Sequence, residues 1–440
     1  MSYLDKYKKI KYEGVSSTNK FAFHHYNPTE KIMGKTMKQH LKFAMSWWHT
    51  INASGTDMFG GNTMDKTLGL QPSIEMYKAK ADFGFELMDL LGIEYYCFHD
   101  IDVAPEGTTL AESEKNLQII VNHLLALQKK YKVKLLWGTA NMFSHKMFMT
   151  GAATGCKDDV YAIAAGKVKA AIDATIKLGG QGYVFWGGRE GYDTLINTDV
   201  GYELDHLGKF LTMARDYGRK HGFKGDFYIE PKPKEPTKHQ YDFDVATCAN
   251  FLRSHNLTKD FKMNVEANHA TLAGHTFQHE LRMARVNGIF GSIDANQGDP
   301  LLGWDTDQFP TNVYDTTFCM YEVLKAGGFT NGGLNFDAKT RRASNTIDDI
   351  LLSYIAGMDA FALGLKKAAA IIQDGRIDKF IKDKYSSYKS AIGKKIDSGK
   401  TSLDELYKYG KDIPYNNVEV PSGSQEYLEE IVNNILFSDK

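Results

Sequence analysis

Short apolar runs alternate with segments of helical periodicity along most of this 440-residue chain. The runs are continuously apolar instead of alternating with polar residues, which is typical of parallel strands buried on both faces. We expect eight strands, over residues 43–47, 95–98, 133–137, 183–186, 227–230, 261–266, 289–294 and 334–337.

Helical periodicity between these runs predicts helices over residues 109–131, 158–180, 203–219 and 276–286. The first opens with Thr109-Leu-Ala-Glu112, the pattern of a capping box. Eight strands separated by helices predict an α/β fold, a (β/α)₈ TIM barrel that ends near residue 338. A doubly wound open sheet has the same local pattern, although no Gly-x-Gly-x-x-Gly follows any run, which counts against a dinucleotide-binding fold.

Composition and hydrophobic pattern divide the chain into three parts. Residues 1–40 are polar and rich in turn residues, and we expect an N-terminal arm packed on the barrel. Residues 41–338 form the predicted catalytic barrel. Residues 339–440 are lysine-rich and mostly helical, with apolar positions too sparse for an independent core, so we expect a C-terminal helical arm that makes subunit contacts.

Composition excludes several classes of protein. The net charge of −1 provides no basic field for nucleic acid or for an anionic membrane. Four scattered cysteines fit free thiols in a reducing compartment better than a disulfide framework. The first ten residues are charged where a signal peptide needs an apolar core, and no apolar run is long enough to span a bilayer. We therefore expect a cytoplasmic protein.

Acidic residues and one histidine stand where the predicted strands end. In a barrel these ends meet at one mouth, and converging carboxylates repel one another unless cations neutralise them. Oxygen ligands select Mg²⁺ or Mn²⁺, and an imidazole favours Mn²⁺ or Co²⁺. These side chains provide enough ligands for two divalent cations if one carboxylate bridges the two ions. The residues are His99, Glu230, Glu266, Asp294 and Asp337, with His269, Asp305 and Asp307 in the following loops.

Two further groups carry chemistry near the strand ends. Asp102 follows His99 at a spacing that lets its carboxylate bind one ring nitrogen and leave the other for acid–base work. The prolines around Lys232 stiffen the chain and would aim this lysine inward, although Lys234 could equally be the inward one. Tryptophans at or beside three strand ends suit the apolar faces of a sugar; they are Trp48, Trp137 and Trp186.

Six ordered motifs closely resemble those of the D-xylose isomerases, and the longer class with an N-terminal extension fits best. The resemblance runs essentially from end to end of the chain. The motifs are Trp186-Gly-Gly-Arg-Glu-Gly191, Glu230-Pro-Lys-Pro-Lys-Glu-Pro-Thr-Lys-His239, Val265-Glu-Ala-Asn-His-Ala-Thr-Leu-Ala-Gly-His275, Ser292-Ile-Asp-Ala-Asn296, Trp304-Asp-Thr-Asp-Gln-Phe-Pro310 and Asn335-Phe-Asp-Ala-Lys-Thr-Arg341.

The resemblance implies a role for each matching residue. It implies one cation held by Glu230, Glu266, Asp294 and Asp337, and a second held by Glu266, His269, Asp305 and Asp307. It implies that His99, oriented by Asp102, assists ring opening and that Lys232 binds the carbonyl oxygen at C1. It also implies that the sugar contacts Trp48, Trp186 and Thr139, that Phe59 reaches a neighbouring subunit's site, and that the C-terminal arm builds a homotetramer.

The activity that follows is the interconversion of D-xylose with D-xylulose, and of D-glucose with D-fructose. Because every acid at the mouth is assigned to a cation or to His99, none is free as an enediol base, and a 1,2-hydride shift between the two cations is the expected route. Three alternatives stay open at this point. They are a related barrel isomerase or epimerase for another sugar such as L-rhamnose, a multi-metal phosphodiesterase that cuts DNA at abasic sites, and a non-catalytic sugar-binding protein.

Overall fold

The computed structural model describes residues 4–438. The chain divides into two compact units, Met1–Leu365 and Lys366–Lys440. Within residues 4–438, no helix is both long and apolar enough to cross a membrane. All four cysteines are free thiols, as their scattered positions predicted.

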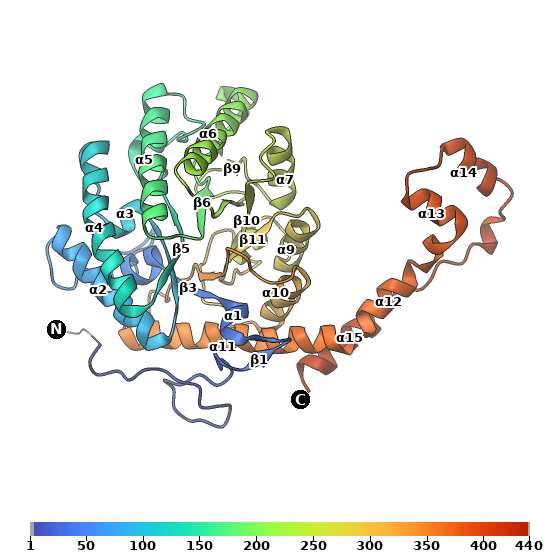
Figure 1. The fold of residues 1–440 in the computed structure, drawn as a ribbon, viewed down its shortest axis with the longest axis horizontal. Helices are drawn as coiled ribbons and strands as arrows, with labels where there is room; N and C mark the ends of the chain where they lie inside the picture. Colours follow the sequence, from blue (N-terminus) through green and yellow to red (C-terminus); the bar gives the residue numbers. More distant parts are fainter. Residues whose placement is uncertain (1–3, 439–440) are drawn as a thin grey trace. The chain divides into compact units, whose positions relative to one another are not determined.

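Eight parallel strands close into a barrel at the centre of the first unit (Figure 1). Each strand pairs with the next along the chain, and the last pairs with the first to close the ring. All eight predicted strands are therefore confirmed, and with them the TIM barrel. They are β3 (Phe43–Ser46), β4 (Tyr95–His99), β5 (Lys134–Thr139), β6 (Gly182–Trp186), β8 (Asp226–Glu230), β10 (Phe261–Glu266), β11 (Phe290–Asp294) and β12 (Leu334–Phe336).

Helices surround these strands (Figure 1). The four predicted helices are present as α4 (Leu110–Tyr131), α5 (Asp158–Lys177), α6 (Val200–Lys220) and α9 (Phe277–Val286). Three further long helices were not predicted, although each begins after a Ser, Asp or Asn whose side chain caps it; they are α2 (Ile74–Leu91), α7 (Val245–Ser254) and α10 (Val313–Lys325). Short α3 (Asp100–Val103) and α8 (Ala267–Leu272) follow β4 and β10 directly, and β7 (Gly191–Tyr192) pairs with β9 (His239–Gln240).

Helix α4 shows how the sequence specifies these elements. Its buried residues Leu117, Ile120 and Leu124 recur at spacings of three and four, and burial of each such side chain stabilises the fold by about 1.5–3 kcal/mol. The Thr109 hydroxyl accepts a hydrogen bond from the Glu112 backbone N–H, as the capping pattern predicted. The Glu112 carboxylate, however, accepts from the N–H and hydroxyl of Thr108 instead of completing the box, because Thr108 offers both donors together.

The N-terminal segment before β3 has little regular structure. It contains a small hairpin, β1 (Lys31–Ile32) with β2 (Lys35–Thr36), and helix α1 (Met37–Leu41). Asp359 anchors the arm, because its carboxylate accepts hydrogen bonds of 2.7–2.9 Å from the backbone N–H groups of His24, His25 and Tyr26. Asp359 belongs to α11 (Ile347–Asp374), which spans the boundary between the two units.

The second unit is helical, with α12 (Arg376–Lys384), α13 (Ala391–Asp397), α14 (Leu403–Gly410) and α15 (Gln425–Leu436). Its internal contacts include the Lys367 ammonium group, which donates to the backbone carbonyls of Ile435 and Ser438. Many of its apolar side chains are exposed, including Leu403, Tyr407 and Tyr415.

Candidate metal centre

Four carboxylates converge where β8, β10, β11 and β12 end. Glu230, Glu266 and Asp294 are the last residues of three of these strands, Asp337 directly follows the fourth, and all four residues are buried. One oxygen of every acid lies within 4.8 Å of the others. The structure thus brings together the predicted strand-end acids Glu230, Glu266, Asp294 and Asp337.

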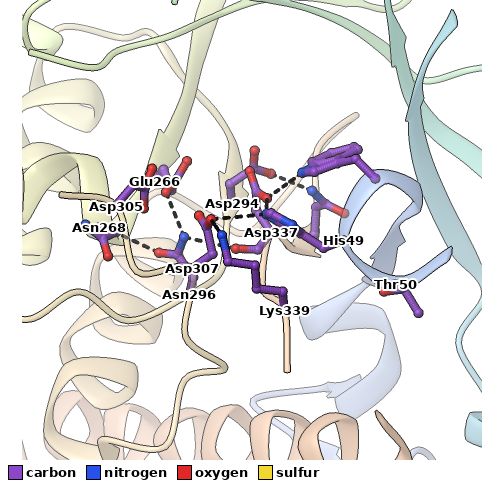
Figure 2. A network of polar contacts seen from close by, with 12 residues as sticks. His49, Thr50, Glu266, Asn268, Asp294, Asn296, Asp305, Asp307, Asp337 and Lys339 are labelled. Atoms are coloured by element: carbon purple, nitrogen blue, oxygen red, sulfur yellow. Dashed lines mark hydrogen bonds and ion pairs between the residues drawn. The ribbon is translucent and has the colours of Figure 1, made fainter. Parts of the chain in front are cut away.

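A second group shares Glu266 with the first. The loop after β11 carries Asp305 and Asp307, and their oxygens lie within 4.8 Å of one from Glu266. His269 stands in the first turn of α8, and its Nε2 atom lies 3.0 Å from both Glu266 Oε2 and Asp305 Oδ2. Figure 2 shows the acids from the loop beside those from the strands. A shared carboxylate between two groups is the arrangement that the sequence predicted for a pair of cations.

Burial and mutual repulsion shift the protonation of these acids. Burial raises the pKa of both Glu230 and Glu266 well above the ordinary value, and neighbouring carboxylates raise it further. Burial and the Asp337 carboxylate raise the pKa of Asp294 to about 7. Burial also opposes ionisation of Asp307, but His49 and Lys339 outweigh it and hold its pKa well below the ordinary value.

Several ligand-type atoms in these groups are buried without a hydrogen-bond partner among residues 4–438. They are Asp294 Oδ2, Asp305 Oδ1 and His269 Nδ1. A buried acceptor without a donor is costly, and a cation relieves that cost for carboxylate oxygens. The donor set is mostly carboxylate oxygen with one imidazole, which fits divalent cations such as Mg²⁺, Mn²⁺ and Co²⁺.

Three asparagine amides orient the strand-end acids. The amide Nδ2 of Asn264 donates to Glu230 Oε2 (2.9 Å) and that of Asn335 to Asp294 Oδ1 (2.8 Å), while Asn296 Nδ2 donates to Glu266 Oε1 (2.7 Å). No role of these amides was predicted from the sequence. A signal was present, because Asn264-x-Glu266 and Asn335-x-Asp337 place amide and acid on the same face of a strand.

His99 and Asp102 form the predicted pair at the end of β4. His99 Nδ1 lies 2.8 Å from Asp102 Oδ2, and the His99 backbone N–H donates to the same oxygen. Burial alone would lower the pKa of His99, but the Asp102 carboxylate outweighs it and raises that pKa above the ordinary value. The His99 ring lies edge-on to Trp48 with centroids 4.7 Å apart. Asp102 thus occupies Nδ1 and leaves Nε2 for a ligand.

Lys232 is the inward-pointing lysine, and Lys234 is exposed. The Lys232 ammonium group lies 2.9 Å from Asp305 Oδ2 and 3.2 Å from Glu235 Oε2. It also lies 5.4 Å from the centre of the Trp186 ring. Burial opposes the charge, but Asp305 and other nearby acids raise the pKa of Lys232 above its ordinary value, so the lysine stays cationic.

One pocket of about 360 Å³ is lined by His99, by Lys232 and by all members of the two acid groups except Asp294. Its aromatic walls include Trp48, Trp137, Phe143 and Trp186. Thr139 lines it too, with its hydroxyl donating to the Val184 carbonyl at 2.6 Å. Phe59 does not line this pocket in a single chain, and its side chain is 95% exposed.

The site also contains two basic residues that the sequence patterns did not predict, His49 and Lys339. His49 Nε2 lies 2.7 Å from Asp337 Oδ1 and 3.5 Å from Asp307 Oδ2, and Lys339 Nζ lies 2.7 Å from Asp307 Oδ2 (Figure 2). Burial opposes charge on His49, yet Asp307 and Asp337 raise its pKa to about 9. His49 follows β3 in the π-helical turn Trp48–Asn52, so its place just past a strand end was the available signal.

Known proteins resemble the chain over nearly its full length. Residues 381–436 match the family described as XylA2 C-terminal domain. A xylose isomerase from Thermotoga sp. (strain RQ2) is 57% identical over 437 residues, which cover 99% of this chain and 98% of the relative. One from Thermotoga neapolitana is 58% identical, with 97% and 96% covered. One from Thermoanaerobacter pseudethanolicus is 54% identical, with 100% of both chains covered.

Proposed function

The chain belongs to the xylose isomerase family, and we propose that its strand-end pocket interconverts D-xylose and D-xylulose, and also D-glucose and D-fructose, with two divalent cations. The observation that supports this most directly is the pair of acid groups that share Glu266 inside a pocket of sugar size. The same pocket presents a histidine, a lysine and tryptophan walls to a ligand.

We assign one cation, as the resemblance implies, to the strand-end acids Glu230, Glu266, Asp294 and Asp337, and the other to Glu266, His269, Asp305 and Asp307. When bound, such ions act as Lewis acids that polarise the sugar oxygens. Mg²⁺, Mn²⁺ and Co²⁺ all suit this donor set.

The residues of the chain then divide the remaining work. His99, whose Nδ1 is held by Asp102, has Nε2 left to exchange a proton with the sugar as the pyranose ring opens. The buried Lys232 ammonium group would hydrogen-bond the carbonyl oxygen at C1 of the open chain. Trp48, Thr139 and Trp186 would position the sugar and exclude water.

Isomerisation moves the hydrogen on C2 to C1 and the proton on O2 to O1. Transfer of the hydrogen with its electron pair, a 1,2-hydride shift, suits this pocket better than a free enediol. The enediol route needs a carboxylate base that is free beside C2. Here Glu235 pairs with Lys232, and the other pocket acids lie in the two groups. Tritium at C2 should therefore stay in the sugar, and its release into water during turnover would contradict the hydride route.

We further propose that the chain is cytoplasmic and forms a homotetramer, in which the 339–440 arm makes subunit contacts and Phe59 reaches a neighbour's pocket. Exposed apolar side chains such as Leu403 and Tyr407 support a role of the arm in assembly. Sedimentation tests the arm's role by measuring the mass in solution of the full chain and of a chain that lacks residues 381–440. We expect the mass of a tetramer for the full chain and a smaller assembly for the shortened one.

Removal and return of metal tests the proposed activity. We expect xylulose formation from D-xylose to vanish after EDTA treatment and to return with Mg²⁺ or Mn²⁺. Glu266→Gln should stay inactive with metal present, because the shared carboxylate of both groups is lost. Glu75→Gln, an exposed acid on α2, is the matched control and should behave like the wild type. If metal-replete wild type leaves xylose unchanged, the substrate assignment fails, and other aldoses should be screened.

A further inference from the structure

A second group of metal-type ligands lies outside the pocket, at the start of α9. This α9 cluster consists of Asp244, His275, His279 and Glu280. One ligand atom each from His275, His279 and Glu280 lies within 4.8 Å of the others. Nε2 of each histidine lies 4.0 Å from Glu280 Oε1, and His275 Nε2 lies 3.2 Å from Asp244 Oδ2. The two imidazole rings stack with centroids 4.6 Å apart, so both nitrogens face the same acid.

One oxygen of the Glu280 carboxylate is buried without a hydrogen-bond donor among the described residues. Its side chain is only 4% exposed, and Oε2 accepts a hydrogen bond of 2.8 Å from the Val245 backbone N–H. Oε1 is buried and accepts no hydrogen bond from any residue between 4 and 438. Burial also raises the pKa of this carboxyl above its ordinary value. An oxygen that is buried, unpaired and directed at two imidazoles is suited to a cation.

The ligand types define the kind of cation. Two imidazoles with carboxylates are the ligands of zinc-type ions, whereas Mg²⁺ and Ca²⁺ prefer oxygen alone. Zinc bonds of about 2.0–2.1 Å place tetrahedral ligand atoms roughly 3.3 Å apart. The 3.2 Å spacing between His275 and Asp244 already matches this value. The two 4.0 Å spacings to Glu280 need a small contraction, which the part-exposed side chains of His275 and His279 can supply by rotation. We propose that the α9 cluster binds one divalent transition-metal ion of the zinc type, separately from the two cations of the pocket.

An ion there would join three elements. Asp244 caps α7 through Oδ1, which accepts from the Thr247 N–H at 2.7 Å. His275 follows the end of α8, the helix whose first turn holds His269, and Glu280 belongs to the first turn of α9. The bound ion therefore stabilises this side of the barrel and requires no change in the pocket.

Counting bound ions in the full-length protein tests the proposal. Wild type, His275→Gln and His279→Gln are stripped with EDTA, dialysed against Zn²⁺, and measured for zinc per chain by mass spectrometry. His221→Gln removes another exposed histidine, one that lies against the Tyr217 carbonyl, and serves as the matched control. We expect three zinc ions per chain in wild type and in His221→Gln, and two in either cluster variant. Zinc should also raise the thermal midpoint of wild type more than that of His279→Gln.

The proposal would be overturned if wild type and both cluster variants bound the same number of zinc ions per chain. It would also be overturned if His221→Gln lost as many zinc ions as the cluster variants. The total of three rests on the two cations proposed for the pocket, but the difference of one zinc ion between wild type and the cluster variants does not, so this difference is independent of the isomerase assignment. His279 is exposed at the surface, so its replacement leaves the packed core intact.

Discussion

His49 Nε2 and Asp337 Oδ1 lie 2.7 Å apart, and Trp48 Nε1 donates to the same oxygen at 2.7 Å. Two neighbouring residues of one turn after β3 therefore hold a carboxylate at the end of β12. The contact exists because β12 pairs with β3 where the barrel closes. Asp337 is consequently oriented before any cation arrives.

Replacement of His49 should weaken metal binding without removing a proposed ligand. We expect His49→Asn to lower metal affinity about 10- to 100-fold, the usual effect of losing a partner that orients a metal ligand. Titration of the stripped protein with Mn²⁺ measures the change. His123→Asn breaks a comparable 2.9 Å pair with Asp82 on the outer helices and should leave affinity unchanged. An unaltered affinity in His49→Asn would show that Asp337 needs no such support.

Loss of the Asp102 charge should lower the pKa of His99 and slow the reaction. The carboxylate raises the pKa of His99, so Asp102→Asn should shift the protonation of His99 to lower pH. We also expect kcat for D-xylose to fall about 10- to 100-fold, as for a lost hydrogen bond to a charged group worth roughly 1.5–3 kcal/mol. NMR titration of the histidine rings, together with steady-state kinetics, measures both effects. Asp82→Asn removes the partner of His123 and is the control; an unshifted His99 titration would contradict the assignment.

Metal affinity should increase with pH. Burial and repulsion raise the pKa of Glu230 and Glu266, and that of Asp294 to about 7. At lower pH these acids carry protons that an incoming cation must displace, so affinity rises until they ionise and then levels off. Calorimetric titration with Mg²⁺ near neutral pH, in two buffers of different ionisation enthalpy, should show proton release. The same heat in both buffers would mean that the acids are already ionised.

The N-terminal arm should depend on Asp359. Asp359→Ala leaves three backbone N–H groups without their acceptor, and we expect a loss of about 3 kcal/mol in the free energy of unfolding. Chemical denaturation measures this loss, and proteolysis of the arm should accelerate. Asp348→Ala removes a part-buried hydrogen bond from Tyr7 and an exposed ion pair with Lys20, and should have a smaller effect because the Asp348 side chain is 37% exposed. Equal losses in the two variants would show that burial of Asp359 is unimportant.

The sequence predicted the barrel well because parallel strands buried on both faces are continuously apolar, and the acids at their ends interrupt those runs. Residues such as Glu266 and Asp294 could therefore be placed at one mouth without coordinates. His49 also follows a strand end, but its ion pairs with Asp307 and Asp337 could not be predicted, because they depend on the direction that its side chain takes in the turn after β3. The loop pattern alone left Lys232 and Lys234 as alternatives, since both alternate with prolines, and the family resemblance chose Lys232. The structure buries Lys232 and exposes Lys234.

The amides beside the acids bear on how this site could change in evolution. Each of Asn264, Asn296 and Asn335 donates to a carboxylate from a neighbouring strand. Each amide–acid pair therefore depends on two separate segments of the chain. A single substitution in either segment leaves the other member mismatched. The acids and amides at the strand ends should therefore change rarely in evolution. New sugar preferences should arise in the aromatic walls of the pocket, where one side chain can change alone.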